Sequence, residues 1–286
     1  MSSFDEKTTV IQSLQPGQEL PLPPRSLRGR LLANFDQDGA SAGRKSEMSE
    51  QSMQESRLGF SDEWEQRYSE STHLSIWPWS DLVSYVNRYA KPKDDFNTVL
   101  ELGCGAGANI PLFLGRNDNY FAIEGSQSIV DKLIQKFPRY ADNIVCGDFT
   151  KEIPFPLMFD VIVDRASLTH NRNQSIAMCL KLLSGKTRVG GIFIGIDWFS
   201  ERHSDSKKGV PVDSHTRRSI ESKTFGGVGN VHFSDKSHLV DMFGAAGFEI
   251  TMLEHKTTEM LIGDNDTTQG SFNFVAVKTG ATGQRL

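Results

Sequence analysis

The sequence predicts an α/β protein built on a doubly wound, mostly parallel sheet. From Asn97 onward, short apolar segments of strand length alternate with segments whose apolar residues repeat at helical spacing. A glycine-dense turn follows the first of these strands directly. The last two strand-like segments have no helix between them, which predicts an antiparallel hairpin at the edge of the sheet.

Seven segments are expected to be strands because they are short, apolar and bounded by turn residues. The first five are separated by helices or by helix-sized crossovers, so they should run parallel and be covered on both faces. The seven strands are expected at 98–102, 119–124, 143–146, 159–164, 190–198, 248–255 and 272–278.

Four helices are expected between these strands. The first is short and spans 108–114. Ser126 caps the second, which ends at Pro138 because proline cannot continue a helix. Gly185 is expected to close the third, and Ser234 is expected to open the fourth.

Composition divides the chain into three parts. Residues 1–60 hold no Trp or Tyr and are rich in Pro, Gly, Ser and charge, so they cannot bury enough apolar surface to offset their ordering entropy. We expect a disordered N-terminal extension there, either simply solvated or used as an interaction tail. Residues 61–95 are expected to form a helical cap, with one helix from Ser61 and another over 79–89. Residues 96–280 form the α/β domain.

Charge and cysteine usage exclude several classes of protein. The chain has 31 Lys+Arg against 36 Asp+Glu and a net charge of −5, which argues against a partner bound through a nucleic-acid backbone. No apolar run approaches the roughly 18 residues that a membrane span needs, and the first residues lack the apolar core of a secretory signal. The three cysteines have no CxxC spacing and no histidine at metal spacing, so we expect reduced thiols, no metal site and a cytoplasmic location.

The most informative segment is VLELGCGAG, residues 99–107. Gly103, Gly105 and Gly107 let the backbone adopt positive φ and approach a ligand closely at the end of the first strand. A dinucleotide-binding turn needs two residues between its second and third glycines, so the spacing here disfavours NAD. A tight turn that binds no ligand is the alternative.

At this segment the chain resembles the class I S-adenosylmethionine-dependent methyltransferases, whose first motif is an acidic residue, one further residue and then G-x-G-x-G. Glu101 occupies the acidic position. The resemblance extends over about residues 61–280. It implies a Rossmann-like sheet of seven strands and the cofactor S-adenosyl-L-methionine, bound in part by Glu101 and the three glycines.

The resemblance also assigns cofactor contacts after the second and third strands. In FAIEGS, Glu124 is expected to hold both ribose hydroxyls, with Gly125 and Ser126 beside it. In CGDF, Asp148 is expected near the adenine amine and Phe149 beside the ring. Glu124 as an ordinary acid at a strand end, and Asp148 as a simple turn residue, are the alternatives.

Two further elements complete the expected cofactor site. Asp164, at the end of the fourth strand, is expected to contact the methionine end of the cofactor or the acceptor. The sequence EWEQRY is similar to an element that covers the cofactor in this family, which implies a lid formed by Trp64, Arg67 and Tyr68.

Residues after the fourth and fifth strands are candidates for the acceptor side. His170 is the first choice as a general base because its ordinary pKa lies near neutrality. The alternative is a loop histidine with no role in catalysis. Asp197 is the second candidate catalytic residue, and His203 follows it.

Residues 200–233 form a long insertion at the same edge, which is typical of an active-site lid. Its positive side chains favour an acidic acceptor or leave a solvated basic loop: His215, Arg217, Arg218 and His232. Trp77 and Trp79 either line the acceptor pocket or pack the N-terminal helices onto the sheet.

The sequence therefore predicts a methyltransferase that acts on an oxygen or nitrogen of a small molecule, for example a sugar or an acidic metabolite. The Asn-Pro-Pro-Tyr signature of nucleic-acid amino-methylating enzymes is absent, since the fourth strand continues as DRASL. A non-catalytic protein that binds the cofactor and uses its N-terminal tail for interaction is the alternative.

Overall fold

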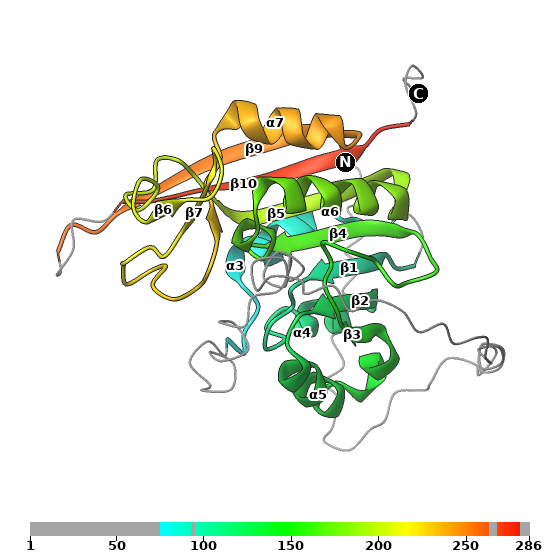
Figure 1. The fold of residues 1–286 in the computed structure, drawn as a ribbon. Helices are drawn as coiled ribbons and strands as arrows, with labels where there is room; N and C mark the ends of the chain where they lie inside the picture. The colour runs from blue at the N-terminus through cyan, green and yellow to red at the C-terminus, as the bar shows by residue number, and fades with distance from the viewer. Residues whose placement is uncertain (1–74, 93–94, 263–267, 281–286) are drawn as a thin grey trace, which may run out of the picture. The chain divides into compact units, whose positions relative to one another are not determined.

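The computed structural model describes residues 75–92, 95–262 and 268–280. Its centre is a seven-stranded sheet with strand order β3-β2-β1-β4-β5-β10-β9 (Figure 1). Strands β1 to β5 are parallel, and β10 runs antiparallel to both β5 and β9. The predicted mostly parallel sheet with an antiparallel hairpin at one edge is confirmed. The strands are β1 Thr98–Leu102, β2 Asn119–Glu124, β3 Ile144–Cys146, β4 Phe159–Arg165, β5 Thr187–Phe199, β9 Phe248–Glu259 and β10 Thr268–Lys278.

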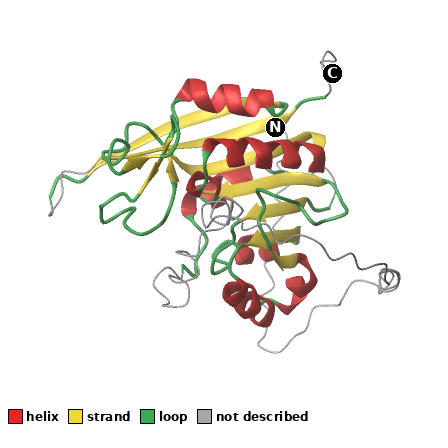
Figure 2. Ribbon diagram, viewed as in Figure 1, coloured by secondary structure: helices red, strands yellow, loops and turns green. Residues whose placement is uncertain are grey.

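Helices cover both faces of this sheet (Figure 2). Within β4, Val161 and Val163 pack into an apolar cluster with α3, α4 and α5, while Ile162 packs into a second cluster with α6 and α7. This alternation follows from the two-residue period of a strand and makes the sheet doubly wound. The helices are α3 Ser80–Tyr89, α4 Ile110–Gly115, α5 Gln127–Lys136, α6 Asn173–Lys186 and α7 Lys236–Ala245.

Local hydrogen bonds set the helix ends. They confirm one predicted end and shift another by one residue. The Ser126 cap of α5 is confirmed, because its hydroxyl accepts a hydrogen bond from the Ile129 amide at 3.3 Å. The predicted end at Gly185 is wrong: α6 continues to Lys186, and the Thr187 hydroxyl donates to the Leu183 carbonyl at 2.7 Å, satisfying one of the last carbonyls.

At α7 the cap lies one residue later than predicted. The Asp235 carboxylate accepts from the His238 amide at 2.7 Å, whereas Ser234 pairs with Ser200 in an isolated β-bridge. Asp235 therefore takes the N-cap position that the sequence analysis gave to Ser234.

The insertion at 200–233 is more ordered than the predicted loop. It carries a separate antiparallel sheet of three very short strands, β6 Val210–Pro211, β7 Thr216–Arg218 and β8 Val231–His232 (Figure 1). Five of its side chains form a small apolar core that packs against Phe199 at the end of β5: Ile220, Phe225, Val228, Val231 and Phe233. The insertion is thus anchored to the sheet through its own core.

The predicted cap is described only from residue 75 onward, and there α3 confirms the helix expected near residues 79–89. Leu82 and Val86 of α3 are fully buried and pack against the sheet. The proposed extension at 1–60, the helix expected from Ser61 and the lid residues Trp64, Arg67 and Tyr68 lie outside the described residues.

Replacing Gly195 with alanine should lower the free energy of unfolding by about 1–3 kcal/mol, the usual cost of overpacking a core. An added Cβ would lie 2.3 Å from the Cζ atom of Phe274, the residue opposite Gly195 on β10. The Phe274 ring has no room to move because it packs against Phe193, Trp198 and Phe243.

Gly244→Ala is the matched control for urea unfolding of both variants. Gly244 is an exposed residue in α7, and nothing lies within 4 Å of the Cβ that alanine would add there. This second change should be neutral or slightly stabilising. Equal stability of the two variants would contradict the packing constraint at Gly195.

Candidate active site

A cavity of about 710 Å³ opens at the carboxyl ends of the parallel strands. Its wall includes the turns that follow β1, β2, β3 and β4 and the end of β5. The strand order reverses between β1 and β4, and ligands of open α/β sheets bind where such a reversal leaves a crevice. The predicted site residues on its wall are Glu101, Gly103, Gly105, Glu124, Gly125, Asp148, Phe149, His170 and Asp197.

The glycine turn after β1 brings main chain to the cavity wall. Gly103 has φ of +60°, and a Cβ there would lie 2.5 Å from the Cβ of Ser167, so the position accepts only glycine. Gly105 has φ of +51°, and its amide donates to the Glu124 carboxylate at 2.8 Å. Gly107 is not part of the wall: its Cβ would meet Leu133 of α5 at 2.5 Å, so this glycine permits close helix packing.

Glu124 ends β2 with its carboxylate at the cavity. It is only 2% exposed, and its two oxygens accept from the amides of Gly105 at 2.8 Å and Ser126 at 3.1 Å. These main-chain donors hold the carboxylate in one orientation. Ser126 itself lies behind the wall, where it caps α5, while Gly125 lines the cavity.

Glu101 is a buried carboxyl group at the floor of the cavity. Its oxygens accept from the Asn109 amide group at 2.8 Å and the Tyr120 hydroxyl at 2.6 Å. Burial raises the pKa of Glu101 to about 7, although both hydrogen bonds act in the opposite direction. The site therefore holds an acid that titrates near neutrality and is kept in place by two neutral partners.

Asp148 and Phe149 follow β3 and line the same cavity. One Asp148 oxygen accepts from the Thr150 amide at 2.9 Å and the Thr150 hydroxyl at 2.6 Å, and the other lies 3.1 Å from the Lys151 ammonium group. The Phe149 side chain is partly buried against the core. The turn thus presents a carboxylate and a ring side by side.

Asp164, which was predicted to contact the cofactor or the acceptor, is not among the residues of the cavity wall. It is fully buried and accepts from the Ser167 hydroxyl and, at 3.0 Å, from the Leu168 amide. Burial raises its pKa to about 6. Asp164 is the penultimate residue of β4, and its hydrogen bonds fix the start of the following loop. That loop carries Ser167 and His170, both of which line the cavity.

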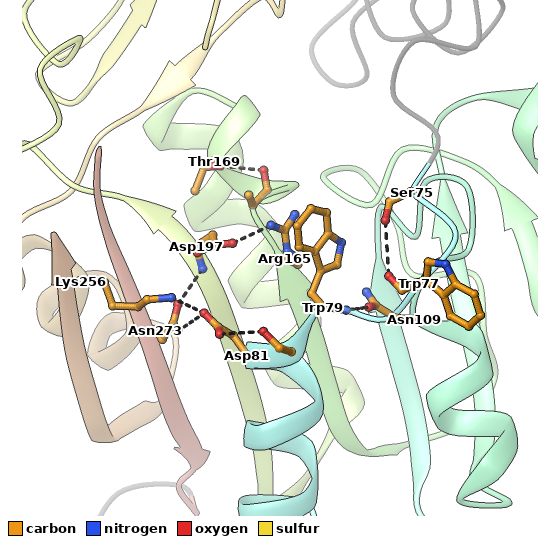
Figure 3. Close-up of polar contacts among 12 residues, drawn as sticks. Ser75, Trp77, Trp79, Asp81, Asn109, Arg165, Thr169, Asp197, Lys256 and Asn273 are labelled. Atoms are coloured by element: carbon orange, nitrogen blue, oxygen red, sulfur yellow. Dashed lines mark hydrogen bonds and ion pairs between the residues drawn. The ribbon is translucent and has the colours of Figure 1, made fainter. Parts of the chain in front are cut away.

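A charged pair and an aromatic ring form another part of the wall (Figure 3). The Arg165 guanidinium pairs with the Asp197 carboxylate at 2.7 Å and stacks 3.5 Å above the Trp79 ring. Trp79 lines the cavity, which is one of the two roles expected for it, whereas Trp77 is 75% exposed and is not part of the wall. The Arg165–Trp79 contact was missed because nothing in the sequence links two such distant residues.

The backbone beside this cluster is strained at two neighbouring points. Ala166 has φ of +56° and Asp197 has φ of +55°, and the Ala166 amide donates to the Ile196 carbonyl at 3.1 Å. The Asp197 amide in turn donates to the Asn273 side chain at 2.9 Å, which connects it to β10. Such strain persists only where surrounding contacts impose it, and it concentrates at functional sites.

Asn273 links this strained point to α3. Its amide group donates to Asp81 at 3.3 Å, and Lys256 of β9 pairs with the same carboxylate (Figure 3). Asp197 is therefore braced from three elements, α3, β9 and β10.

His170 sits in the short helix Leu168–His170 after β4. Its Nδ1 atom lies 3.1 Å from the Asn230 carbonyl of the insertion, and its ring is 5.6 Å from that of Phe199. The insertion itself adds His203, Thr224 and Phe225 to the wall, as the lid prediction implied.

The positive side chains of the insertion do not reach the cavity. The wall includes none of His215, Arg217, Arg218 and His232. His232 is buried, with its Nε2 atom 3.1 Å from that of His238 in α7. These four side chains, on which the prediction of an acidic acceptor rested, therefore do not line the cavity.

Sequence reasoning also missed the contribution of β10. Gln269, Gly270 and Ser271 line the cavity at the start of that strand. Their position depends on the antiparallel pairing of β10 with β5, which brings distant segments together.

The described residues do not form a disulfide, a metal site or a membrane span. Cys104 and Cys179 are buried thiols, Cys146 is exposed, and none is in a disulfide. Within 75–92, 95–262 and 268–280, no group of three His, Cys, Asp or Glu side chains is arranged for a metal ion. No helix in these ranges is long and apolar enough to cross a membrane.

The raised pKa of Glu101 has a measurable effect on stability. Between its ordinary pKa of 4.5 and about 7, the folded protein binds more protons than the unfolded chain, so the free energy of unfolding falls as pH rises. Glu101→Gln removes this pH-dependent contribution to the free energy of unfolding. The stability of the variant relative to wild type should therefore increase across that window, by on the order of 3 kcal/mol.

Urea unfolding at a series of pH values tests this, with Glu152→Gln as the control at an exposed carboxyl. The control should show no such trend. A difference between Glu101→Gln and wild type that stays constant with pH would contradict the assignment.

The comparisons with known proteins agree with this geometry. Residues 99–191 match the family model described as a methyltransferase domain. A search of curated protein sequences finds no relative that matches the chain.

Solved methyltransferase structures share the fold at low sequence identity. The 1,6-didemethyltoxoflavin-N1-methyltransferase of Burkholderia thailandensis, with 1,6-didemethyltoxoflavin and S-adenosylhomocysteine bound, is 15% identical, has a TM-score of 0.54 and covers 84% of this chain and 94% of its own. An S-adenosylmethionine-dependent methyltransferase of Methanosarcina mazei is 15% identical with a TM-score of 0.53, covering 71% and 99%. One from Clostridium acetobutylicum is 14% identical with a TM-score of 0.51, covering 71% and 91%.

The family match spans the glycine turn, Glu124 and Asp148, and the sheet has the seven strands that the resemblance implies. Residues 99–191 therefore match a methyltransferase domain, and the chain has the fold of the S-adenosylmethionine-dependent methyltransferases that it resembles.

Proposed function

We propose that the protein transfers a methyl group from S-adenosyl-L-methionine to an oxygen or nitrogen of a small molecule. The observation that carries this proposal is one cavity with two different halves. One half, called the cofactor half below, is made of main chain and carboxylates after β1, β2 and β3. The other, called the acceptor half, is lined by ring side chains and by Arg165. The Burkholderia structure, which holds a cofactor product and 1,6-didemethyltoxoflavin together, supports such a division.

The residues of the first half fit the cofactor. Glu124 offers two carboxylate oxygens to the ribose diol, and Asp148 with Phe149 suits the amine and face of adenine. A side chain at Gly103 would collide with Ser167 at 2.5 Å, so the turn keeps main chain at the cavity wall. Glu101 is a buried acid at the floor of this half, while Gly107 and Ser126 lie behind its wall and support it. Trp64, Arg67 and Tyr68 remain the proposed lid.

When bound, the cofactor supplies a methyl group already activated by its sulfonium charge. The protein must align the acceptor with that group and exclude water. The ring side chains and the insertion line the second half of the cavity, and we assign them both purposes.

His170 is the proposed general base for an acceptor that holds a proton. A carbonyl oxygen can only accept, so the contact with Asn230 at 3.1 Å requires a proton on Nδ1. In the neutral ring Nε2 is then the basic nitrogen. Asp197 is paired with Arg165, and we assign it the role of fixing that guanidinium beside the acceptor rather than of a base.

Macromolecular acceptors are not part of the proposal. The net charge of −5 offers no broad positive surface for a nucleic-acid backbone, and a cavity of about 710 Å³ suits a small molecule. A cytoplasmic location, where the cofactor and small metabolites are available, belongs to the same proposal.

Glu124→Ala should weaken S-adenosylhomocysteine binding by about 2–4 kcal/mol, the scale of losing charge-assisted hydrogen bonds. Isothermal titration calorimetry measures this, with Asp131→Ala on the exposed side of α5 as the control. Because Glu124 also orders the Gly105 amide, the comparison should be repeated with adenosine and 2′,3′-dideoxyadenosine.

Wild type should prefer the nucleoside that carries the diol, and Glu124→Gln should lose most of that preference. A folded Glu124→Ala protein with unchanged affinity would contradict the assignment of this residue.

His170→Ala should lower turnover by roughly 10²–10⁴, the contribution of a positioned general base, while S-adenosylhomocysteine binding stays intact. Activity is first found by incubating the protein with methyl-labelled cofactor and fractionated small metabolites, and then following the labelled product. In wild type, turnover should also fall toward acidic pH as the imidazole takes up a proton.

The pH–rate profile of the variant is the decisive comparison. If His170→Ala keeps full turnover and the same acidic limb, His170 is not the base. Absence of labelled product from every fraction, with cofactor bound, would argue against the proposed function itself.

A further inference from the structure

A second histidine, His203 of the insertion, faces the acceptor half of the cavity. It is 5% exposed and part of the wall. Its ring packs against Phe225 at 4.9 Å and Phe233 at 6.0 Å, so its orientation is set by the core of the insertion.

The main chain selects one tautomer of His203. The Asp205 amide donates a hydrogen bond to Nδ1 at 3.0 Å, so that nitrogen carries no proton. Burial lowers the pKa of this imidazole and keeps the ring neutral, although the Asp205 carboxylate lies 4.0 Å away. In a neutral ring the proton is therefore on Nε2. His203 meets a ligand as a hydrogen-bond donor and not as a base.

His170 is held in the opposite tautomer. Its Nδ1 donates to the Asn230 carbonyl at 3.1 Å, which leaves Nε2 as an acceptor. Both selections come from main-chain groups, so neither depends on a side chain that could rotate away.

A row of aromatic rings joins the two histidines. His170 packs on Phe199 at 5.6 Å, Phe199 on Phe225 at 4.7 Å, and Phe225 on His203 at 4.9 Å. Phe199 and Phe225 both line the cavity. Flat groups pack well on such rings, and a ligand lying along the row has an acceptor at one end and a donor at the other.

We infer that the methyl acceptor is a flat molecule with two polar groups of opposite hydrogen-bonding character, a hydroxyl that donates to His170 and an oxygen or ring nitrogen that accepts from His203. The assignment of this hydroxyl as the methylated group rests on the proposed function. The hydroxyl proton passes to His170 as the carbon–oxygen bond forms and the bond from carbon to the sulfonium breaks. His203 is then a residue that determines specificity, supplied by the insertion.

Three flat probes of nearly equal size test the inference on protein saturated with S-adenosylhomocysteine. 6-Hydroxyquinoline carries both groups, quinoline lacks the hydroxyl, and 2-naphthol lacks the ring nitrogen. Dissociation constants are measured by ligand-observed NMR. Wild type should bind 6-hydroxyquinoline roughly threefold to tenfold more tightly than either relative, the range for one net hydrogen bond.

The variants assign each preference to one histidine. His203→Leu should lose the preference over 2-naphthol and keep the preference over quinoline, and His170→Leu should do the reverse. His203→Gln should recover the preference lost in His203→Leu, because its amide nitrogen donates from nearly the same place. His255→Leu, on β9 outside this cavity, is the matched control and should behave as wild type.

Equal affinity of wild type for the three probes, or a ring-nitrogen preference that survives in His203→Leu, would overturn the inference. Both results leave the proposed function standing if S-adenosylhomocysteine still binds. Failure of wild type to bind S-adenosylhomocysteine, measured in the first step of the same titration, would overturn the proposed function instead.

Discussion

The close approach of the turns after β1 and β4 is the constraint on which the site depends. Only the missing side chain of Gly103 allows Ser167 to lie where it does, 2.5 Å from the place of an added Cβ. Because β1 and β4 are neighbours at the reversal of strand order, this contact joins the turn of the cofactor half to the loop that leads to His170. A larger residue at Gly103 would move one half relative to the other.

Three buried carboxyl groups lie close to this junction. Glu101 and Glu124 are each 2% exposed and Asp164 is fully buried, and the burial of Glu101 and Asp164 raises their pKa values. Buried acids are costly unless hydrogen bonds or an opposite charge stabilise them. Main-chain amides, Asn109 and Tyr120 provide the first kind of stabilisation, and a sulfonium cation in the proposed site would provide the second.

What the sequence could predict depended on how local each feature is. The strands and the glycine turn were predicted because periodicity and spacing within a few residues determine them. Motif position identified Glu124 and Asp148 at the cavity but also assigned ligand contacts to Gly107, Ser126 and Asp164, which are not part of its wall, because a motif does not specify which side of the chain a group faces.

The other features that the sequence did not predict are long-range contacts or very short strands. Strands of two or three residues in the insertion are too short for any periodicity to appear. The stacking of Arg165 on Trp79 and the entry of β10 into the wall arise from tertiary packing alone.

The two halves of the cavity differ in how they are built. Main-chain geometry defines the cofactor half, whereas side chains on a segment with its own apolar core complete the acceptor half. Substitution of those side chains leaves the sheet and the glycine turn untouched, so the range of acceptors can diverge during evolution while the methyl donor is conserved.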